Sequence, residues 1–249
     1  MMGLRNLYRV FQETRDAARQ EATLAVTGDS PRAAELAARL GAQREAQGAE
    51  IILTASGGTL TLSGKGIEEP GEISLPSENA LLEELVPRVV LAMDEDYLVP
   101  LAKGYPPFRR AVCEELIRKN ARQNAVIGGL PIPGADMPVM TANQARMVLN
   151  IAAAHDEELS LDRARELLGV LAAGFGLRAL ARQVVKLIPV GGWAAAAAIG
   201  YAGTVAMGRA TMLYFERGRQ KLEEGEISEI RRRAIEEAKV FVSRLRRRR

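Results

Sequence analysis

The chain has 249 residues, of which 47% are hydrophobic, and this is enough apolar material to bury the core of one large domain or two modest ones. Disorder over the whole chain is therefore excluded. Aromatic residues make up only 4%, so the core must consist mainly of Ala, Leu, Val and Ile, which favours packed helices over a β-sandwich. Cys113 is the single cysteine, which excludes an internal disulfide and predicts a reducing compartment, the cytoplasm.

The positive charge is concentrated toward the C-terminal end. The net charge is only +3, but residues 216–249 contain twelve Lys/Arg against seven Glu. Such a tail can bind the phosphates of anionic lipid or of nucleic acid, and the alternative is a solvated helix end. It contains no aromatic residue for base stacking apart from Phe241, so we do not expect nucleic acid. The tail residues are Arg244, Arg246, Arg247, Arg248 and Arg249.

Residues 1–76 predict an N-terminal helix followed by a small α/β module. Apolar residues recur at helical spacing over residues 3–20, which predicts the helix. We expect no secretory signal in these residues. Ser30 is placed to cap a helix that begins at Pro31 and stops at Gly41. Short strands are expected within residues 22–28, 51–54, 59–62 and 72–75. Turn signals separate the last three of them.

Residues 77–249 predict a larger helical domain. One helix begins near Ser77, with Pro87 as a kink or restart, and another spans residues 108–124. Thr141-Ala-Asn-Gln144 has the spacing of a capping box and should open a helix that ends near residue 155. The fold class is thus α+β and mostly α, with a helical bundle around one long Ala/Gly-rich helix.

Two further helical patterns complete this domain. Over residues 161–175 an apolar stripe with 3-4-3-4 spacing indicates a helix packed against another helix. Gly225 is the expected stop before a basic helix over residues 226–249. On the wet side of that helix we expect i,i+4 ion pairs that join Glu229 to Arg233, Arg232 to Glu236, and Arg233 to Glu237.

The uncharged run over residues 187–207 has two interpretations. At about 1.5 Å per residue it would span roughly 31 Å as a helix, which matches the hydrocarbon thickness of a bilayer. Its many Ala and Gly residues make insertion marginal, so a buried helix of a bundle is the alternative. Small residues at every fourth position permit close helix contact in either case and could support a homo-oligomer. The candidate packing or membrane positions are Gly192, Trp193, Ala196, Gly200, Thr204 and Gly208.

Five ordered motifs carry a resemblance to a known family. They are Asn124-Ala-Val-Ile-Gly128, Pro131-Ile-Pro-Gly-Ala-Asp-Met-Pro138, Gly174-Phe-Gly-Leu-Arg178, Lys186-Leu-Ile-Pro-Val-Gly-Gly192 and Gly203-Thr-Val-Ala-Met-Gly208. With them, residues 108–218 resemble domain of unknown function 697, a helical domain that follows the G domain in some Era-like bacterial GTPases and occurs in YcjF-like inner-membrane proteins. The resemblance implies a bacterial protein associated with membranes and with GTPases, and no reaction.

A GTPase would need a phosphate-cradling loop, and the turn at Gly28 is the place to look for one. In that motif, Gly-x-x-x-x-Gly-Lys-Ser/Thr, the lysine contacts phosphates and the hydroxyl binds magnesium. Counting from Gly28, the second glycine, the lysine and the hydroxyl residue are replaced by Ala33, Ala34 and Glu35. A degenerate G-like fold and an ordinary α/β module both remain open here.

No group of residues predicts catalysis, a cofactor or a metal. His155 is the only histidine, and we interpret it as a cationic residue favoured by a helix C-terminus, although Asp156 follows it. We interpret Cys113 as a buried apolar residue. The acidic clusters at residues 94–96 and 156–158 lack the spacing of a calcium loop and predict solvated helix ends.

The function that we expect is therefore that of a non-enzymatic interaction or scaffold protein, associated with or inserted in the cytoplasmic membrane. Its expected partners are anionic lipid or another protein, including a GTPase. The alternative is a soluble, catalytically inactive GTPase-like or nucleotide-binding protein.

Overall fold

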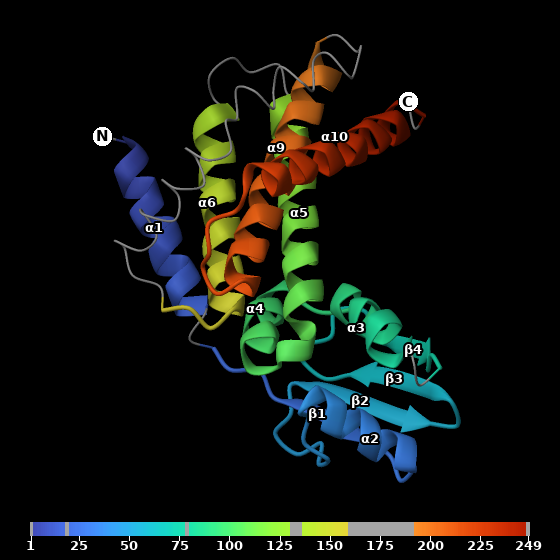
Figure 1. Ribbon diagram of the computed structural model, residues 1–249. Helices are drawn as coiled ribbons and strands as arrows, with labels where there is room; N and C mark the ends of the chain where they lie inside the picture. The colour runs from blue at the N-terminus through green and yellow to red at the C-terminus, as the bar shows by residue number, and fades with distance from the viewer. Residues whose placement is uncertain (1, 18–19, 78–79, 130–135, 159–191, 248–249) are drawn as a thin grey trace. The chain divides into compact units, whose positions relative to one another are not determined.

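The computed structural model describes residues 2–17, 20–77, 80–129, 136–158 and 192–247 (Figure 1). Two compact units are present. We call them the sheet unit (Arg15–Glu115 and Ala153–Glu157) and the helical unit (Met1–Thr14, Leu116–Ala152 and Glu158–Arg249). Residues 77–115 thus group with the sheet. The domains that we expected, 1–76 and 77–249, stay a prediction about which segments fold independently.

The predicted fold class is confirmed, because a small N-terminal sheet is accompanied by a larger set of helices. The sheet has four strands in the order β1-β2-β3-β4: β1 (Leu24–Thr27), β2 (Ile51–Ser56), β3 (Thr59–Ser63) and β4 (Gly71–Ser74). The pair β1 and β2 is parallel and the other two pairs are antiparallel. Gly57 and Gly58 both have positive φ, as a tight hairpin turn between β2 and β3 requires.

Helix α2 (Pro31–Leu40) connects the two parallel strands and packs on β1. Both predicted caps are confirmed. The hydroxyl of Ser30 accepts a hydrogen bond of 3.1 Å from the backbone N–H of Ala33, and Gly41 adopts the left-handed conformation at the helix end. The apolar face of α2 buries Leu36 and Leu40, which complete this side of the sheet core.

Two short helices follow the sheet within the same unit. Helix α3 (Leu81–Leu91) contains Pro87 without a break, and α4 (Glu95–Gly104) leads to a 3₁₀ turn, η2 (Pro106–Phe108). We did not predict α4. Its signal was the acidic cluster that we interpreted as a helix end: Asp94 accepts a hydrogen bond of 2.9 Å from the N–H of Asp96 and caps α4.

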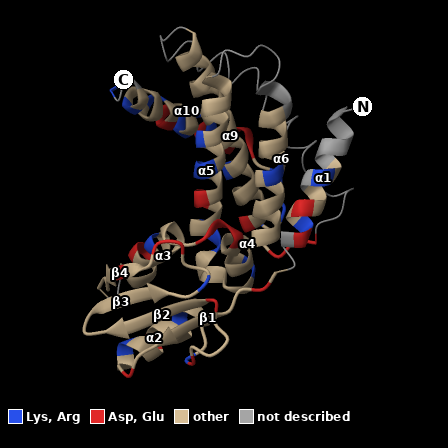
Figure 2. Ribbon diagram, turned by 180° about the vertical axis from the view of Figure 1, so that it is seen from behind, with Lys and Arg blue, Asp and Glu red and all other residues tan. Residues whose placement is uncertain are grey.

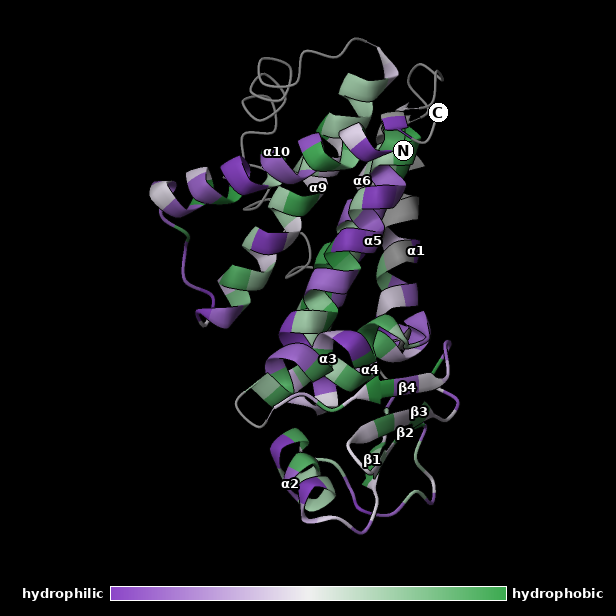
Figure 3. Ribbon diagram, turned by 90° about the vertical axis from the view of Figure 1, so that its right-hand side faces the viewer, coloured by the Kyte–Doolittle hydropathy of each residue, from purple (hydrophilic) through white to green (hydrophobic). Residues whose placement is uncertain are grey.

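Long helices form the described part of the helical unit. They are α1 (Met2–Ala17), α5 (Arg109–Gly129), α6 (Asp136–Ala154), α9 (Trp193–Glu216) and α10 (Glu224–Arg247), and the first three extend across the division between the units. Helix α10 crosses and packs against α9 (Figure 1). Figure 3 shows the contrast between them, with α9 mostly hydrophobic and α10 alternating between polar and apolar residues.

Two predicted helix boundaries are wrong. Helix α6 begins at Asp136 and includes Thr141, because Pro138 falls in its first turn, where the missing backbone N–H of proline removes no helical hydrogen bond. Gly225 does not stop a helix but lies in the first turn of α10. The chain leaves α9 through Gly218 and Arg219, which both have positive φ. The stripe predicted over residues 161–175 lies outside the described residues.

Over the ranges that the structure describes, no helix has both the length and the apolar character needed to cross a membrane. Residues 187–191, the first residues of the uncharged run over residues 187–207, lie outside these ranges. Within α9, the described remainder of the run is followed by Gly208 and then by the charged Arg209.

Candidate functional site

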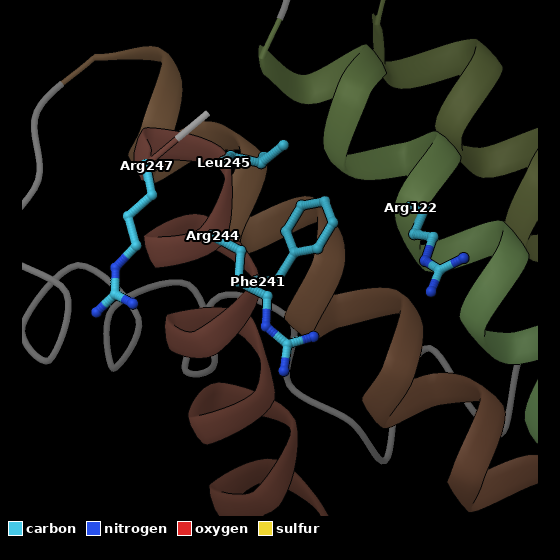
Figure 4. A pocket seen from close by; sticks show the side chains of 5 residues that line it. All are labelled: Arg122, Phe241, Arg244, Leu245 and Arg247. Atoms are coloured by element: carbon cyan, nitrogen blue, oxygen red, sulfur yellow. The ribbon is translucent and has the colours of Figure 1, made fainter. Parts of the chain in front are cut away.

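A pocket at the C-terminal end of α10 brings together cationic side chains from two helices. Its volume is about 620 Å³, within the range of about 300 to 1,000 Å³ that is typical of small-molecule sites. Arg122 projects from α5 on one side, and α10 provides the other lining residues (Figure 4). We call this site the arginine pocket; it is lined by Arg122, Phe241, Arg244, Leu245 and Arg247.

The sequence of α10 explains why its lining residues face this pocket. Ala234, Ile235, Ala238 and Val242 are buried and fix the rotation of the helix. The ring of Phe241 then stacks on the buried ring of Tyr201 from α9, with centroids 4.5 Å apart and planes 19° apart. Such stacking contributes beyond the area that it buries. One ring of the pocket wall is therefore held in place by the helix behind it.

The arginine pocket has an excess of positive charge. Residues 238–249 contain six Lys/Arg and no acidic residue. Within the described ranges, none of the guanidinium groups of Arg122, Arg244 and Arg247 pairs with a carboxylate. Figure 2 shows basic residues at this end of α10 and mixed charges nearer its start.

The carboxylates earlier in α10 are already engaged. Glu237 accepts a hydrogen bond of 2.5 Å from Arg209 of α9, instead of pairing with Arg233 as predicted. Glu229 forms ion pairs with Arg232, at 2.7 Å, and with Arg233, at 2.6 Å. The predicted pair of Glu229 with Arg233 is therefore confirmed, whereas Arg232 pairs with Glu229 instead of the predicted Glu236. These two guanidinium groups lower the pKa of Glu229 to about 2. Glu229 and Glu237 therefore do not neutralise the pocket.

The phenol of Tyr201 lies in the mixed field of these groups. Its burial raises the pKa, and Glu237 raises it further, while Arg122, Arg118 and Arg209 act in the opposite direction. The hydroxyl therefore stays neutral at ordinary pH, and the ring serves as a packing support for Phe241.

The predicted basic tail is only partly described. Arg244 and Arg247 line the pocket, whereas nothing is described of the Arg246 side chain or of Arg248 and Arg249. Arg122 was missed, since it belongs to a different helix and no pattern in the sequence links it to the tail.

The small-residue positions of α9 lie against other helices of the same unit. A Cβ atom on Gly200 would lie 2.6 Å from the backbone oxygen of Asn124 on α5, and one on Gly208 would lie 2.5 Å from Ile117. Thr204, between them, is fully buried. This close approach is reciprocal, because a Cβ on Gly128 of α5 would lie 3.0 Å from the carbonyl oxygen of Ala196.

The first two positions of that set are different. Gly192 precedes α9 with a positive φ, and Trp193 is 37% exposed. The central part of the stripe is thus used within the chain. These contacts give no support to a homo-oligomer through the same face of α9. The homo-oligomer stays a prediction.

The other sequence candidates belong to the sheet unit, and one interpretation is wrong. His155 follows the last residue of α6, but its surroundings do not favour a cation: burial lowers its pKa, Arg109 lowers it further, and Glu157 opposes them. We had neglected this desolvation. Cys113 is fully buried on α5, as expected. The acidic cluster after His155 includes Asp156, which pairs with Lys103 at 3.8 Å.

Metal ligands do not gather in the part of the chain that the structure describes, where no three His, Cys, Asp or Glu side chains are placed to share an ion. The expected lack of a cofactor and of catalysis stays a prediction. What the arginine pocket offers chemically is charge and fork-shaped N–H donors for an anion, next to an apolar wall.

The fold and the pocket define a mostly helical protein with a basic anion-binding candidate site. The chain belongs to the family described as "Domain of unknown function (DUF697)", whose model matches residues 106–240. This match confirms the family and includes Arg122 as well as the first residues of α10 up to Val240. Comparison with curated proteins and with solved structures gives no match.

Proposed function

We propose that this protein is a non-enzymatic interaction protein that docks on the anionic surface of the cytoplasmic membrane through the arginine pocket and the basic end of α10. The observation that carries the proposal is that Arg122, Arg244 and Arg247 line the same pocket as Phe241, with no carboxylate of the described chain paired to them. Basic residues near an anionic lipid surface each contribute about 1 kcal/mol to binding.

The proposal is tested by sedimentation of the whole protein with vesicles. Neutral phosphatidylcholine vesicles are compared with vesicles that also contain phosphatidylglycerol, over a series of salt concentrations. We expect binding only to the anionic vesicles and weaker binding as salt increases, because counterions screen the attraction. Equal binding to both kinds of vesicle, or no binding to either, would contradict membrane docking through charge.

Paired variants locate the surface. Arg244→Gln with Arg247→Gln removes two pocket charges, and we expect roughly a tenfold or greater loss of binding. Arg232→Gln with Arg233→Gln removes the same charge from the same helix, but Glu229 already neutralises part of it, so a much smaller loss is expected. Equal losses in the two variants would mean that overall charge alone drives binding.

An alkaline carbonate wash of cell membranes distinguishes surface docking from insertion. Release of the protein agrees with docking, whereas retention would show that a segment is inserted. This measurement matters because residues 159–191, which directly precede Gly192, lie outside the described ranges.

The alternative is a soluble, GTPase-like or nucleotide-binding protein without catalysis, and the β1–α2 turn offers little for it. The backbone N–H of Ala33, one of the donors that a phosphate would use, is hydrogen-bonded to Ser30. Calorimetry with guanine and adenine nucleotides tests this alternative. Heat of binding that persists when Arg244 and Arg247 are replaced by Gln would locate a nucleotide away from the arginine pocket and favour it. A GTPase remains a second partner class that the family resemblance implies.

A further inference from the structure

The arginine pocket contains more than a general basic surface requires. Two of its guanidinium groups come from α10, but Arg122 comes from α5, so the cationic groups approach one volume from separate helices (Figure 4). In the view of Figure 4, the guanidinium of Arg244 extends to the side of α10 that faces Arg122, whereas that of Arg247 points away from both. A flat basic helix face would attract charge but would not present donors from two helices.

Fork-shaped donors that reach one volume from two helices, Arg122 from α5 and Arg244 from α10, suit an anion with several free oxygens. A phosphate monoester has three free oxygens and a charge of about −1.5 to −2 near pH 7. A phosphate diester has a single charge and two free oxygens, and the two substituents leave it less accessible. Arginine binds phosphate oxygens in pairs, so each additional guanidinium group distinguishes the monoester from the diester further.

The apolar wall of the pocket can contact the carbon atoms to which the phosphate is attached. Phe241 and Leu245 are partly exposed and line the same volume as the arginines. The pocket volume of about 620 Å³ exceeds what one phosphate group needs, given about 30 Å³ per water molecule in the liquid. Carbon atoms attached to the phosphate can therefore contact Phe241 and Leu245 while the phosphate reaches the arginines.

From this geometry we propose that the arginine pocket recognises the terminal phosphate of a lipid headgroup, as in phosphatidic acid, in preference to a lipid phosphodiester. The inference rests on the proposed membrane docking and specifies which headgroup the site selects. Arg122 is the residue that confers the selection, since without it the remaining donors all belong to one helix.

The test uses the whole protein and vesicles matched in total surface charge, with phosphatidic acid in one set and phosphatidylglycerol in the other. We expect roughly tenfold tighter binding to phosphatidic acid, the factor that one additional charge-assisted hydrogen bond supplies. Equal binding to the two sets would overturn the selectivity and leave membrane docking standing. No binding to either set would instead remove the proposed function.

Variants of Arg122 test its assignment. Arg122→Gln should lower binding to phosphatidic acid to about the level of phosphatidylglycerol, and Arg122→Lys, which keeps the charge but loses the fork, should lose most of the preference. Arg232→Gln, outside the pocket on α10, should leave the preference unchanged. Circular dichroism verifies that each variant is folded. A preference that survives in folded Arg122→Gln overturns the assignment.

A soluble phosphate compound is the remaining source of the same chemistry. Calorimetry with glycerol 3-phosphate, without vesicles, separates it from the lipid. We expect binding much weaker than that to phosphatidic acid vesicles, because the lipid adds the membrane attraction of the other basic residues. Binding as tight as that to the vesicles would overturn the lipid assignment in favour of a free phosphate ligand.

Discussion

The side-chain amide of Asn124 on α5 donates a hydrogen bond of 2.9 Å to the hydroxyl of Thr204 on α9, and both side chains are fully buried. Thr204 in turn donates to the carbonyl oxygen of Gly200 at 2.8 Å, and Asn143 of α6 donates to Asn124 at 3.2 Å. Three helices of the helical unit are thereby joined through one polar cluster. Because a buried polar group costs stability when its partner is missing, the cluster fixes which faces of these helices meet.

The first prediction concerns this pair. Thr204→Val keeps the shape but leaves the amide of Asn124 without its partner, and should lower the free energy of unfolding by about 1 to 3 kcal/mol. Thr211→Val is the matched control on α9, since Thr211 is equally buried but donates only to the carbonyl of Met207, in its own helix. Urea denaturation measures both. A loss in Thr211→Val as large as that in Thr204→Val would contradict the role of the inter-helix bond.

A double-variant cycle isolates the interaction itself. Asn124→Leu and Thr204→Val should together cost less than the sum of the two single changes, by about 0.5 to 3 kcal/mol, because the second change removes a partner that is already lost. Strict additivity would show that the pair contributes no coupling energy.

The second prediction concerns the closest approach of α5 and α9. Alanine is normally the better helix former by about 1 kcal/mol, but at position 200 its Cβ would lie 2.6 Å from the backbone oxygen of Asn124, which cannot move independently. Gly200→Ala should therefore destabilise the protein by about 1 to 3 kcal/mol. Gly225→Ala, where nothing lies within 4 Å, should be neutral or slightly stabilising. Thermal denaturation that shows equal shifts for the two variants would refute this packing.

The elements that the sequence could predict are those set by local chemistry. The caps at Ser30 and Gly41 are confirmed, as is the turn at residues 56–58, because each depends on a few neighbouring residues. The predicted start of α6 was wrong because a capping-box spacing at Thr141 does not exclude a helix that has already begun. Local patterns thus locate helices better than they locate the ends of helices.

The arginine pocket could be predicted only in half. The concentration of arginine after residue 238 is visible in the sequence, and so is the apolar stripe that contains Phe241. Arg122 belongs to a helix distant in the sequence, and its proximity to α10 depends on tertiary packing through Tyr201 and the buried face of α10. The prediction that His155 is a cation was wrong for the same reason, since the burial of His155 is decided by residues far along the chain.

The third prediction concerns the aromatic stack behind the pocket. Phe241→Ala removes the ring that packs on Tyr201 and should lower the free energy of unfolding by about 1 to 3 kcal/mol, less than for a fully buried ring because Phe241 is partly exposed. Val240→Ala, at the neighbouring position that is 50% exposed, should change it by less than about 0.5 kcal/mol. Denaturant titrations compare them, and similar losses would show that the stack is unimportant for folding.

The last prediction is a pH dependence from His155. Burial and Arg109 lower its pKa in the folded protein, so the unfolded chain binds the proton more readily. Above the ordinary pKa of about 6.5 both states are neutral and the residue has no effect. As the pH falls through that value the unfolded state gains protons first, and stability decreases. Wild type should therefore lose stability relative to His155→Gln between about pH 7 and pH 5, in denaturant titrations at each pH; parallel curves would contradict the lowered pKa.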